Sequence, residues 1–161
     1  MFYQLSSIHK VPVAGLQAHC AKLRRKQLGQ ITLTELVTLP ESFGGIYLFY
    51  SSDGECLYVG KASRWAFSSR IPQHFDFRQD AWMNSFPKKL VKAEVCADLR
   101  SAVLCALKCE MCAFTFSSDQ AAWDYAKDVE TFLRSVLSPR LNTSNRHYDD
   151  TLSVSDHIRH A

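Results

Sequence analysis

Residues 45–60 read GIYLFYSSDGECLYVG, and this stretch predicts a β-hairpin. Residues 46–50 and 56–59 are rich in aromatic and branched side chains, which favour strands. Asp53 and Gly54 lie between the two runs. An Asp-Gly pair in this position is a strong hairpin signal, because both central residues of a type I′ turn need positive φ. We therefore expect two antiparallel strands joined by a two-residue turn.

The expected turn also sets the register of the hairpin. Counting outward from the turn pairs Phe49 with Tyr58. Two residues further out, Tyr47 pairs with Gly60. Because side chains alternate between the faces of a sheet, Tyr47 and Tyr58 share one face as diagonal neighbours, and Gly60 leaves space beside the Tyr47 phenol. The opposite face is expected to be core and carries Ile46, Leu48 and Val59.

Basic residues follow the hairpin. Lys61 comes directly after the second strand. Arg70 and His74 are four residues apart, so a helix over residues 62–75 would place them on one face. Pro72 lies between them and is expected to shorten or kink that helix.

A carboxylate and an amide come much later in the chain. We expect a helix over residues 120–137, with Asp119 as its N-cap. Glu130 lies beside apolar residues of this helix, which predicts a carboxylate at the margin of a buried surface. Pro139 ends the helix, and Asn142 follows. Taken alone, each of these residues is more simply explained as a surface or turn residue; their joint order after the hairpin indicates a site.

Together, these motifs resemble the GIY-YIG nuclease superfamily over about residues 44–142. The family pattern is a Gly-Ile-Tyr strand, a Tyr-Ile-Gly strand, often a lysine, an Arg and a His or Tyr on the first helix, a Glu on a later helix, and an Asn after a proline-containing loop. The matching residues are Gly45-Ile46-Tyr47, Tyr58-Val59-Gly60, Lys61, Arg70, His74, Glu130-Thr131-Phe132-Leu133 and Pro139-Arg140-Leu141-Asn142. The pattern departs from the family in the long 76–111 segment and in Pro72.

The resemblance implies an α+β fold, with a central three-stranded antiparallel sheet flanked by helices. A chain of 161 residues, 47% of them hydrophobic, is long enough for one such domain with a substantial core. We expect residues 1–43 to form an N-terminal helical and strand extension. Residues 76–111 would form an enlarged helical insert within the 44–142 domain, and residues 143–161 a loose polar tail.

The resemblance also implies hydrolysis of phosphodiester bonds in nucleic acid, with DNA as the expected substrate. Glu130 would hold one Mg²⁺ or Mn²⁺ ion, which otherwise keeps water and phosphate oxygens as ligands. Arg70 and Lys61 would contact phosphate. Tyr47 would be the general base, and His74 is the alternative base because its ordinary pKa is closer to neutral.

Two further residues have supporting roles by the same resemblance. Tyr58 would orient Tyr47, the attacking water or a phosphate. Asn142 would either bind phosphate or hold the Glu130 region in place.

Other functions remain open. The chain could be a catalytically silent module of the same fold that binds nucleic acid or protein, although the intact set of site residues argues against this. It could also be a nuclease toxin or effector that acts on DNA or RNA. Cutting both strands of a duplex needs two active sites or two visits, so a homodimer is a further open alternative.

Charge and composition constrain the partners only weakly. The net charge of +3 permits a polyanionic partner without requiring one. Lys22, Arg24 and Arg25 lie at the end of a helix expected over residues 12–26, where they suit the helix dipole; the alternative is contact with a nucleic-acid backbone.

The cysteines and the absence of a signal or spanning segment predict a cytoplasmic protein with no membrane partner. Six cysteines without an export signal are expected to be reduced thiols. Cys105, Cys109 and Cys112 have helical spacing and are expected to be buried apolar residues, with zinc binding as the alternative.

Overall fold

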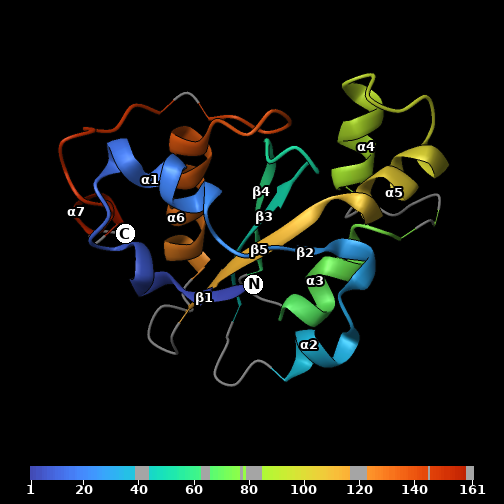
Figure 1. Cartoon of the computed structure of the whole chain (residues 1–161), viewed down its shortest axis with the longest axis horizontal. Helices are drawn as coiled ribbons and strands as arrows, with labels where there is room; N and C mark the ends of the chain where they lie inside the picture. The colour runs from blue at the N-terminus through green and yellow to red at the C-terminus, as the bar shows by residue number, and fades with distance from the viewer. Residues whose placement is uncertain are drawn as a thin grey trace.

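The structure is a computed structural model that describes residues 1–38, 44–62, 66–76, 78, 85–116, 123–144 and 146–158. Within these ranges helices pack on both faces of one mixed five-stranded sheet (Figure 1). The strands are β1 (Phe2–Gln4), β2 (Lys26–Gln27), β3 (Gly45–Tyr50), β4 (Cys56–Ala62) and β5 (Glu110–Thr115). The helices are α1 (Val13–Ala21), α2 (Leu33–Val37), α3 (Phe67–Gln73), α4 (Ser85–Lys92), α5 (Leu99–Lys108), α6 (Trp123–Leu137) and α7 (Val154–Ile158), with short 3₁₀ turns at Leu5–Ile8 and Leu28–Gln30.

The sheet has more strands than the three expected. β3 lies between β4 and β5 and is antiparallel to both. The other edge of β5 bonds to β1 in parallel and to β2 antiparallel. The N-terminal extension therefore contributes two strands, because β5 has an edge that the hairpin leaves open. The result is a mixed sheet in the order β1-β5-β3-β4, with β2 beside the start of β5.

The hairpin has the predicted register but not the predicted turn. Tyr47 pairs with Gly60, and Phe49 pairs with Tyr58. The turn is a three-residue loop, in which the Ser51 amide donates to the Glu55 carbonyl at 2.9 Å. A bulge between the Phe49 and Tyr50 pairings restores the register that a two-residue turn would have given. The prediction of a two-residue turn at Asp53-Gly54 is therefore wrong.

Helix boundaries follow local chemistry. Asp98 caps α5, because its carboxylate accepts the Ser101 amide at 2.8 Å while the Ser101 hydroxyl lies within bonding distance of the Asp98 amide. The 76–111 segment, expected as a helical insert, contains α4 and α5, although its last two residues, Glu110 and Met111, belong to β5. Pro72 is accommodated inside α3. The expected cap Asp119 lies outside the described residues.

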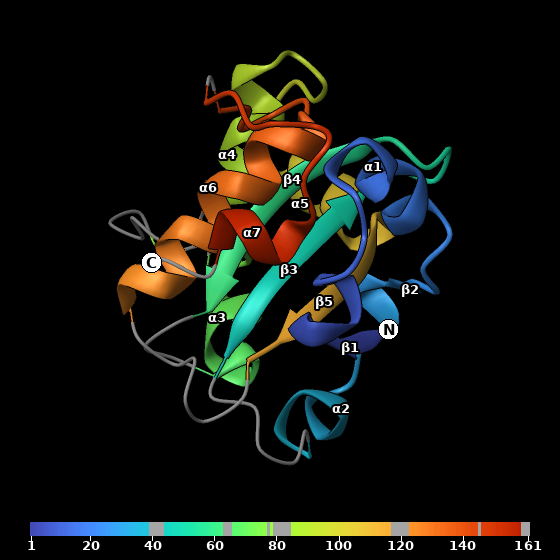
Figure 2. The ribbon, with the colours of Figure 1, turned by 90° about the vertical axis from the view of Figure 1, so that its left-hand side faces the viewer.

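Both faces of the sheet are buried. Ile46 and Leu48 face α1, α6 and α7. Tyr47 and Phe49 face α3, α4 and α5, where they are fully buried. Figure 2 shows the sheet between these two sets of helices. The face that carries the tyrosines is a second core, because the insert helices cover it.

Residues 146–158, expected as part of a loose tail, pack against the body of the protein. Val154 and Ile158 are buried in the core beneath α6. The ring of Tyr148 lies edge-on to that of Phe132, with centroids 4.8 Å apart. The Val154 amide donates to the Val11 carbonyl at 3.1 Å. Val154 and Ile158 are four residues apart, but two apolar residues in a polar segment are too few to define a helical period. No helix in the described ranges is long and apolar enough to cross a membrane.

We expect Ile158→Ala to destabilise the fold by about 2–5 kcal/mol, because it removes a buried side chain. Ile158 is 2% exposed, whereas Leu152 in the same segment is 42% exposed. Leu152→Ala should therefore change the free energy of unfolding by less than about 0.5 kcal/mol. Urea unfolding followed by circular dichroism measures both. Equal effects of the two substitutions would mean that the segment does not dock.

Candidate active site

The Tyr47 phenol is the centre of the predicted site and is completely buried. Its hydroxyl lies 2.8 Å from Nε2 of His74, which caps the C-terminus of α3 and is also completely buried. The sheet thus contributes the phenol and the first helix after the hairpin contributes the imidazole. Both were predicted as site residues from the sequence, and the fold brings them into contact.

A backbone amide fixes the proton on His74. The Phe86 amide donates to Nδ1 of His74 at 3.3 Å, so that nitrogen has no proton of its own. A neutral imidazole then carries its hydrogen on Nε2 and donates it to the Tyr47 oxygen. Burial, and then the Arg70 charge, lower the pKa of His74 well below its ordinary value, which keeps the ring neutral. His74 is therefore a hydrogen-bond donor to Tyr47 in this arrangement, with neither nitrogen available as a base.

Gly60 makes room for the Tyr47 ring. A Cβ atom at residue 60 would lie 2.4 Å from both Cζ and the hydroxyl oxygen of Tyr47, far inside a normal contact. Any larger residue at this position must displace the phenol from His74. The glycine was predicted to leave space here, and the cross-strand pairing of these residues places it directly beneath the ring.

Aromatic rings surround the Tyr47–His74 pair. Tyr58 stacks on Tyr47 with centroids 6.2 Å apart and lies edge-on to His74 at 5.7 Å. Phe86 of α4 approaches Phe49 to 4.7 Å and Tyr58 to 5.6 Å. The enclosure raises the pKa of Tyr47 well above its ordinary value, through burial and then the nearby Tyr58; Arg70 acts in the opposite direction through its charge and a hydrogen bond.

Lys61 and Glu130 form an ion pair at the edge of β4. Lys61 pairs with Ile46 across the hairpin, so its side chain points toward α6 rather than toward Tyr47. Its Nζ donates to Oε2 of Glu130 at 2.6 Å, with the two side chains 19% and 14% exposed. Glu130 is close enough to raise the pKa of Tyr47 through its charge. The carboxylate and the phenol therefore belong to one region that wraps around the edge of the sheet.

The Asn142 side chain completes the outer edge of β4. Its Oδ1 accepts the Val59 amide at 3.1 Å, and its Nδ2 donates to the Val59 carbonyl at 2.6 Å. The Arg140 and Leu141 amides donate to carbonyls of the same strand. The side-chain amide of Asn142 thus makes two hydrogen bonds with the backbone of β4. Of its two expected roles, this geometry matches holding the site together rather than binding phosphate.

The N-terminal basic cluster does not join the site. The Arg25 guanidinium carbon lies 3.7 Å above the Tyr50 ring, and its Nη2 donates to the Ala21 carbonyl at 2.8 Å. Arg25 therefore packs against the fold instead of projecting into solvent. Lys22 and Arg24 are exposed, but they follow α1, which covers the sheet face opposite to Tyr47.

The cysteines considered for zinc point to different layers. Cys109 packs in the core beneath α5, whereas Cys112 packs in the core beneath α6. Across the part of the chain that the structure describes, no three His, Cys, Asp or Glu side chains converge as metal ligands. A Mg²⁺ site built on one carboxylate, such as Glu130, is not such a group.

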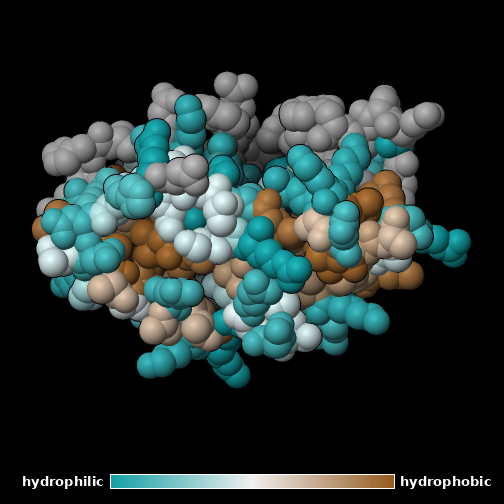
Figure 3. Space-filling view, turned by 90° about the horizontal axis from the view of Figure 1, so that it is seen from above, coloured by the Kyte–Doolittle hydropathy of each residue, from teal (hydrophilic) through white to brown (hydrophobic). Residues whose placement is uncertain are grey.

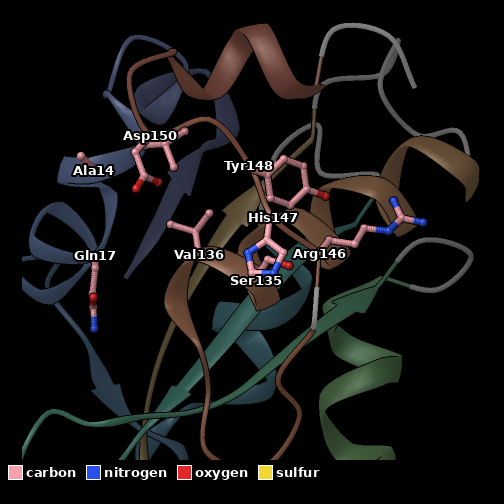
Figure 4. Close-up of a pocket in the computed structure, with 9 residues that line it drawn as sticks. Ala14, Gln17, Ser135, Val136, Arg146, His147, Tyr148 and Asp150 are labelled. Carbon is pink, nitrogen blue, oxygen red and sulfur yellow. The ribbon is translucent and has the colours of Figure 1, made fainter.

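A cavity of about 320 Å³ lies elsewhere, between α1 and the C-terminal segment (Figure 4). Gln17, Ser135, His147 and Asp150 are among the polar residues of its lining. Its lining comes from α1, α6 and the C-terminal segment, which cover the sheet face opposite to the one that carries Tyr47. Figure 4 shows the Arg146 side chain extending away from Asp150, so the charged groups of the lining do not converge on one point.

Sequence reasoning missed the part played by Phe86. Its backbone amide sets the His74 tautomer, and a main-chain donor leaves no trace in residue type.

No family model matches the chain, and comparisons with curated proteins and with solved structures find no match. The chemistry of the site therefore has to be inferred from its geometry.

Gly60→Ala should destabilise the protein by about 1–3 kcal/mol through overpacking against the Tyr47 ring. The cost should shrink when Tyr47 is first changed to Leu, because leucine lacks the ring and hydroxyl atoms that the added Cβ would meet. Urea unfolding of the four proteins in this double-mutant cycle measures the coupling. Gly15→Ala, where an added Cβ meets no atom within 4 Å, is the control and should be neutral or stabilising. An additive cycle would contradict the contact.

Acid should weaken the fold through His74. Because its folded-state pKa lies below the ordinary 6.5, the unfolded chain binds a proton below pH 6.5 that the folded chain refuses. The stabilisation is complete above that pH and is lost at about 1.4 kcal/mol per unit as pH falls toward the folded-state pKa. Unfolding of the wild type and of His74→Gln between about pH 5 and 8 tests this. The wild-type profile should be steeper; parallel profiles would exclude the neutral, buried imidazole.

Proposed function

We propose that this chain is a metal-dependent endonuclease of the GIY-YIG type that hydrolyses phosphodiester bonds of nucleic acid, with DNA as its substrate. The observation that carries the proposal is the Tyr47 phenol, seated on Gly60 and receiving a hydrogen bond from a neutral His74. Two strands and two helices are needed to build this arrangement. A tyrosine that served only as core would not require a glycine beneath its hydroxyl.

Tyr47 is the proposed general base. A phenol can take a proton from water only as phenolate, and burial disfavours that form. Two neighbours favour it: the Nε2 hydrogen of His74 points at the phenol oxygen, and the Arg70 guanidinium lowers the pKa of Tyr47. Hydrogen-bond donors directed at the phenol oxygen stabilise the phenolate, so this arrangement suits a general base better than a general acid. It also favours Tyr47 over His74 for the role.

Glu130 is the proposed ligand of one Mg²⁺ or Mn²⁺ ion. Its carboxylate stands at the margin of the buried surface, and among the described residues its single hydrogen-bond partner is the Lys61 ammonium. The Lys61 ammonium occupies the position beside this carboxylate that a metal ion would take. Bound there, the ion would neutralise charge on a phosphate oxygen. Lys61 would then be released toward the phosphate.

Arg70 is the proposed phosphate ligand on the tyrosine side. It lies in the last turn of α3, is partly exposed, and acts electrostatically on both Tyr47 and His74. A planar guanidinium can hold two phosphate oxygens at once. Together with Lys61 it would bring positive charge to both sides of the β4 edge, where a phosphodiester would lie between the phenol and Glu130.

The rival proposal is a catalytically silent binding module on the same fold. Complete burial of the Tyr47 phenol and the closed Lys61–Glu130 pair favour it, since a base must reach its water. The polar network around the phenol favours the enzyme, because a silent module has no need to fix the proton of His74.

Incubation of supercoiled DNA with the purified protein and Mg²⁺ or Mn²⁺ is expected to give nicked and linear products. Glu130→Gln should lower the rate by at least about 10²-fold, as expected for loss of a charge-stabilising group. Tyr47→Phe should lower it by about 10²–10⁴-fold, the usual contribution of a general base. His74→Gln, which keeps an N–H donor, should retain more activity than Tyr47→Phe.

Glu94→Gln is the matched control, because Glu94 is exposed at the end of α4 and its carboxylate is outside the site. It should cut at the wild-type rate. Single-stranded DNA and RNA are tested in parallel to define the substrate. Absence of cleavage on all three substrates with either metal would exclude the nuclease and leave the binding module.

A further inference from the structure

Three positive side chains gather where α4 lies beside the segment that follows α6. Lys89 and Lys92 belong to α4, a helix with three lysines and no acidic residue. Arg134 lies in the last turn of α6. Arg134 and Lys92 are close enough to Lys89 to lower its pKa by repulsion, after the larger effect of burial. Within the described ranges none of the three forms an ion pair with a carboxylate.

Two members of the cluster, Lys89 and Arg134, are held in place by the backbone that follows α6. Lys89 Nζ donates to the Leu141 carbonyl at 3.2 Å. Arg134 donates through Nε to the Asn142 carbonyl at 2.6 Å and through Nη2 to the Thr143 carbonyl at 3.0 Å. Three successive carbonyls thus anchor charges that repel one another. Like charges fixed together in this way favour the binding of an anion.

The same segment connects the cluster to the candidate active site. The side chain of Asn142 bonds to Val59 of β4, and the next residue of that strand, Gly60, lies under Tyr47. On α6, Arg134 follows Glu130 by one helical turn, about 6 Å along the axis. That distance is close to the rise of two nucleotides along a DNA strand, about 7 Å. The positive charge therefore continues along the outer edge of β4.

The surface formed by α4 and the segment that follows α6 is exposed to solvent. Figures 1 and 2 show α4 standing beside the segment that follows α6. Figure 3 looks down on the same end, where hydrophilic residues project over smaller hydrophobic areas. Lys92 is exposed and Lys89 partly exposed. The surface offers cations, which suits contact with a phosphate backbone rather than reading of base edges.

We propose that Lys89, Lys92 and Arg134 form a track that binds the phosphodiester backbone of the nucleic-acid substrate next to the Tyr47–Glu130 site, an inference that rests on the proposed nuclease function. The insert then has two roles. Its backbone holds His74, and its lysines hold the substrate. The track takes the place of the N-terminal basic cluster, whose Arg25 packs against the fold.

Binding without metal separates this proposal from catalysis. Fluorescence anisotropy with a labelled DNA duplex, in the absence of divalent metal, gives Kd for the wild type and for Lys89→Gln/Lys92→Gln. Glutamine at residue 89 keeps a donor for the Leu141 carbonyl. We expect Kd to rise about tenfold or more at low salt, and the slope of log Kd against log salt to fall by about 1.8, the value for two lost phosphate contacts.

Lys10→Gln/Lys108→Gln is the matched control, since it removes the same charge from two exposed lysines outside the cluster. It should bind like the wild type, apart from a small uniform weakening. If both double variants weaken binding equally, the effect is one of net charge and the track is excluded. The track is also overturned if the Lys89→Gln/Lys92→Gln variant binds DNA normally but loses a thermal shift produced by inorganic phosphate, because the cluster would then hold free phosphate.

The cleavage assay keeps the two proposals distinct. If the Lys89→Gln/Lys92→Gln variant binds DNA more weakly and the wild type never cuts DNA, the result supports the track and rejects the nuclease. Cleavage by a wild type whose DNA binding is insensitive to these substitutions rejects the track and leaves the nuclease. If the wild type cuts DNA, the Lys89→Gln/Lys92→Gln variant should show a larger rise in KM than fall in kcat. It loses substrate contacts but keeps Tyr47 and Glu130.

Discussion

The contact between the Tyr47 phenol and Gly60 is the constraint on which the rest of the site depends. With no Cβ at residue 60, the ring can lie flat against the neighbouring strand and bring its oxygen to His74. His74 in turn must be neutral and must present Nε2, which the Phe86 amide ensures. The space at Gly60 thus positions the phenol, and the end of α3 and the start of α4 supply the groups that meet it. The insert is part of the site because it closes this chain of contacts.

The two faces of β4 keep the Lys61–Glu130 ion pair apart from the aromatic rings that enclose Tyr47. Gly60 faces the aromatic layer, and its neighbour Lys61 faces α6 and Glu130. The phenol can therefore remain dry while the carboxylate stays at the surface, although the charge of Glu130 raises the pKa of Tyr47. A site at the edge of a sheet permits this division. A site in the middle of a face would bury both groups or neither.

Local pattern was enough to predict the register of the hairpin and the shared face of Tyr47 and Tyr58, because alternation and strand pairing are short-range constraints. The turn was predicted incorrectly because a bulge can compensate for one extra loop residue without leaving a signal in composition. Burial of the tyrosine face depended on α4 and α5 folding back from a distant part of the chain. The Phe86 amide depended on backbone position, which no residue type reveals.

The parallel pairing of β1 with β5 has a consequence for how the chain reaches this structure. Phe2 lies opposite Ala113, so the contact closes a loop that spans most of the protein. The entropy of closing such a loop is lost before the strand contacts compensate for it, and high contact order slows folding. Until β1 arrives, part of the outer edge of β5 has unpaired backbone groups that another chain could join. The short N-terminal strand therefore protects this part of the β5 edge from self-association once it has paired.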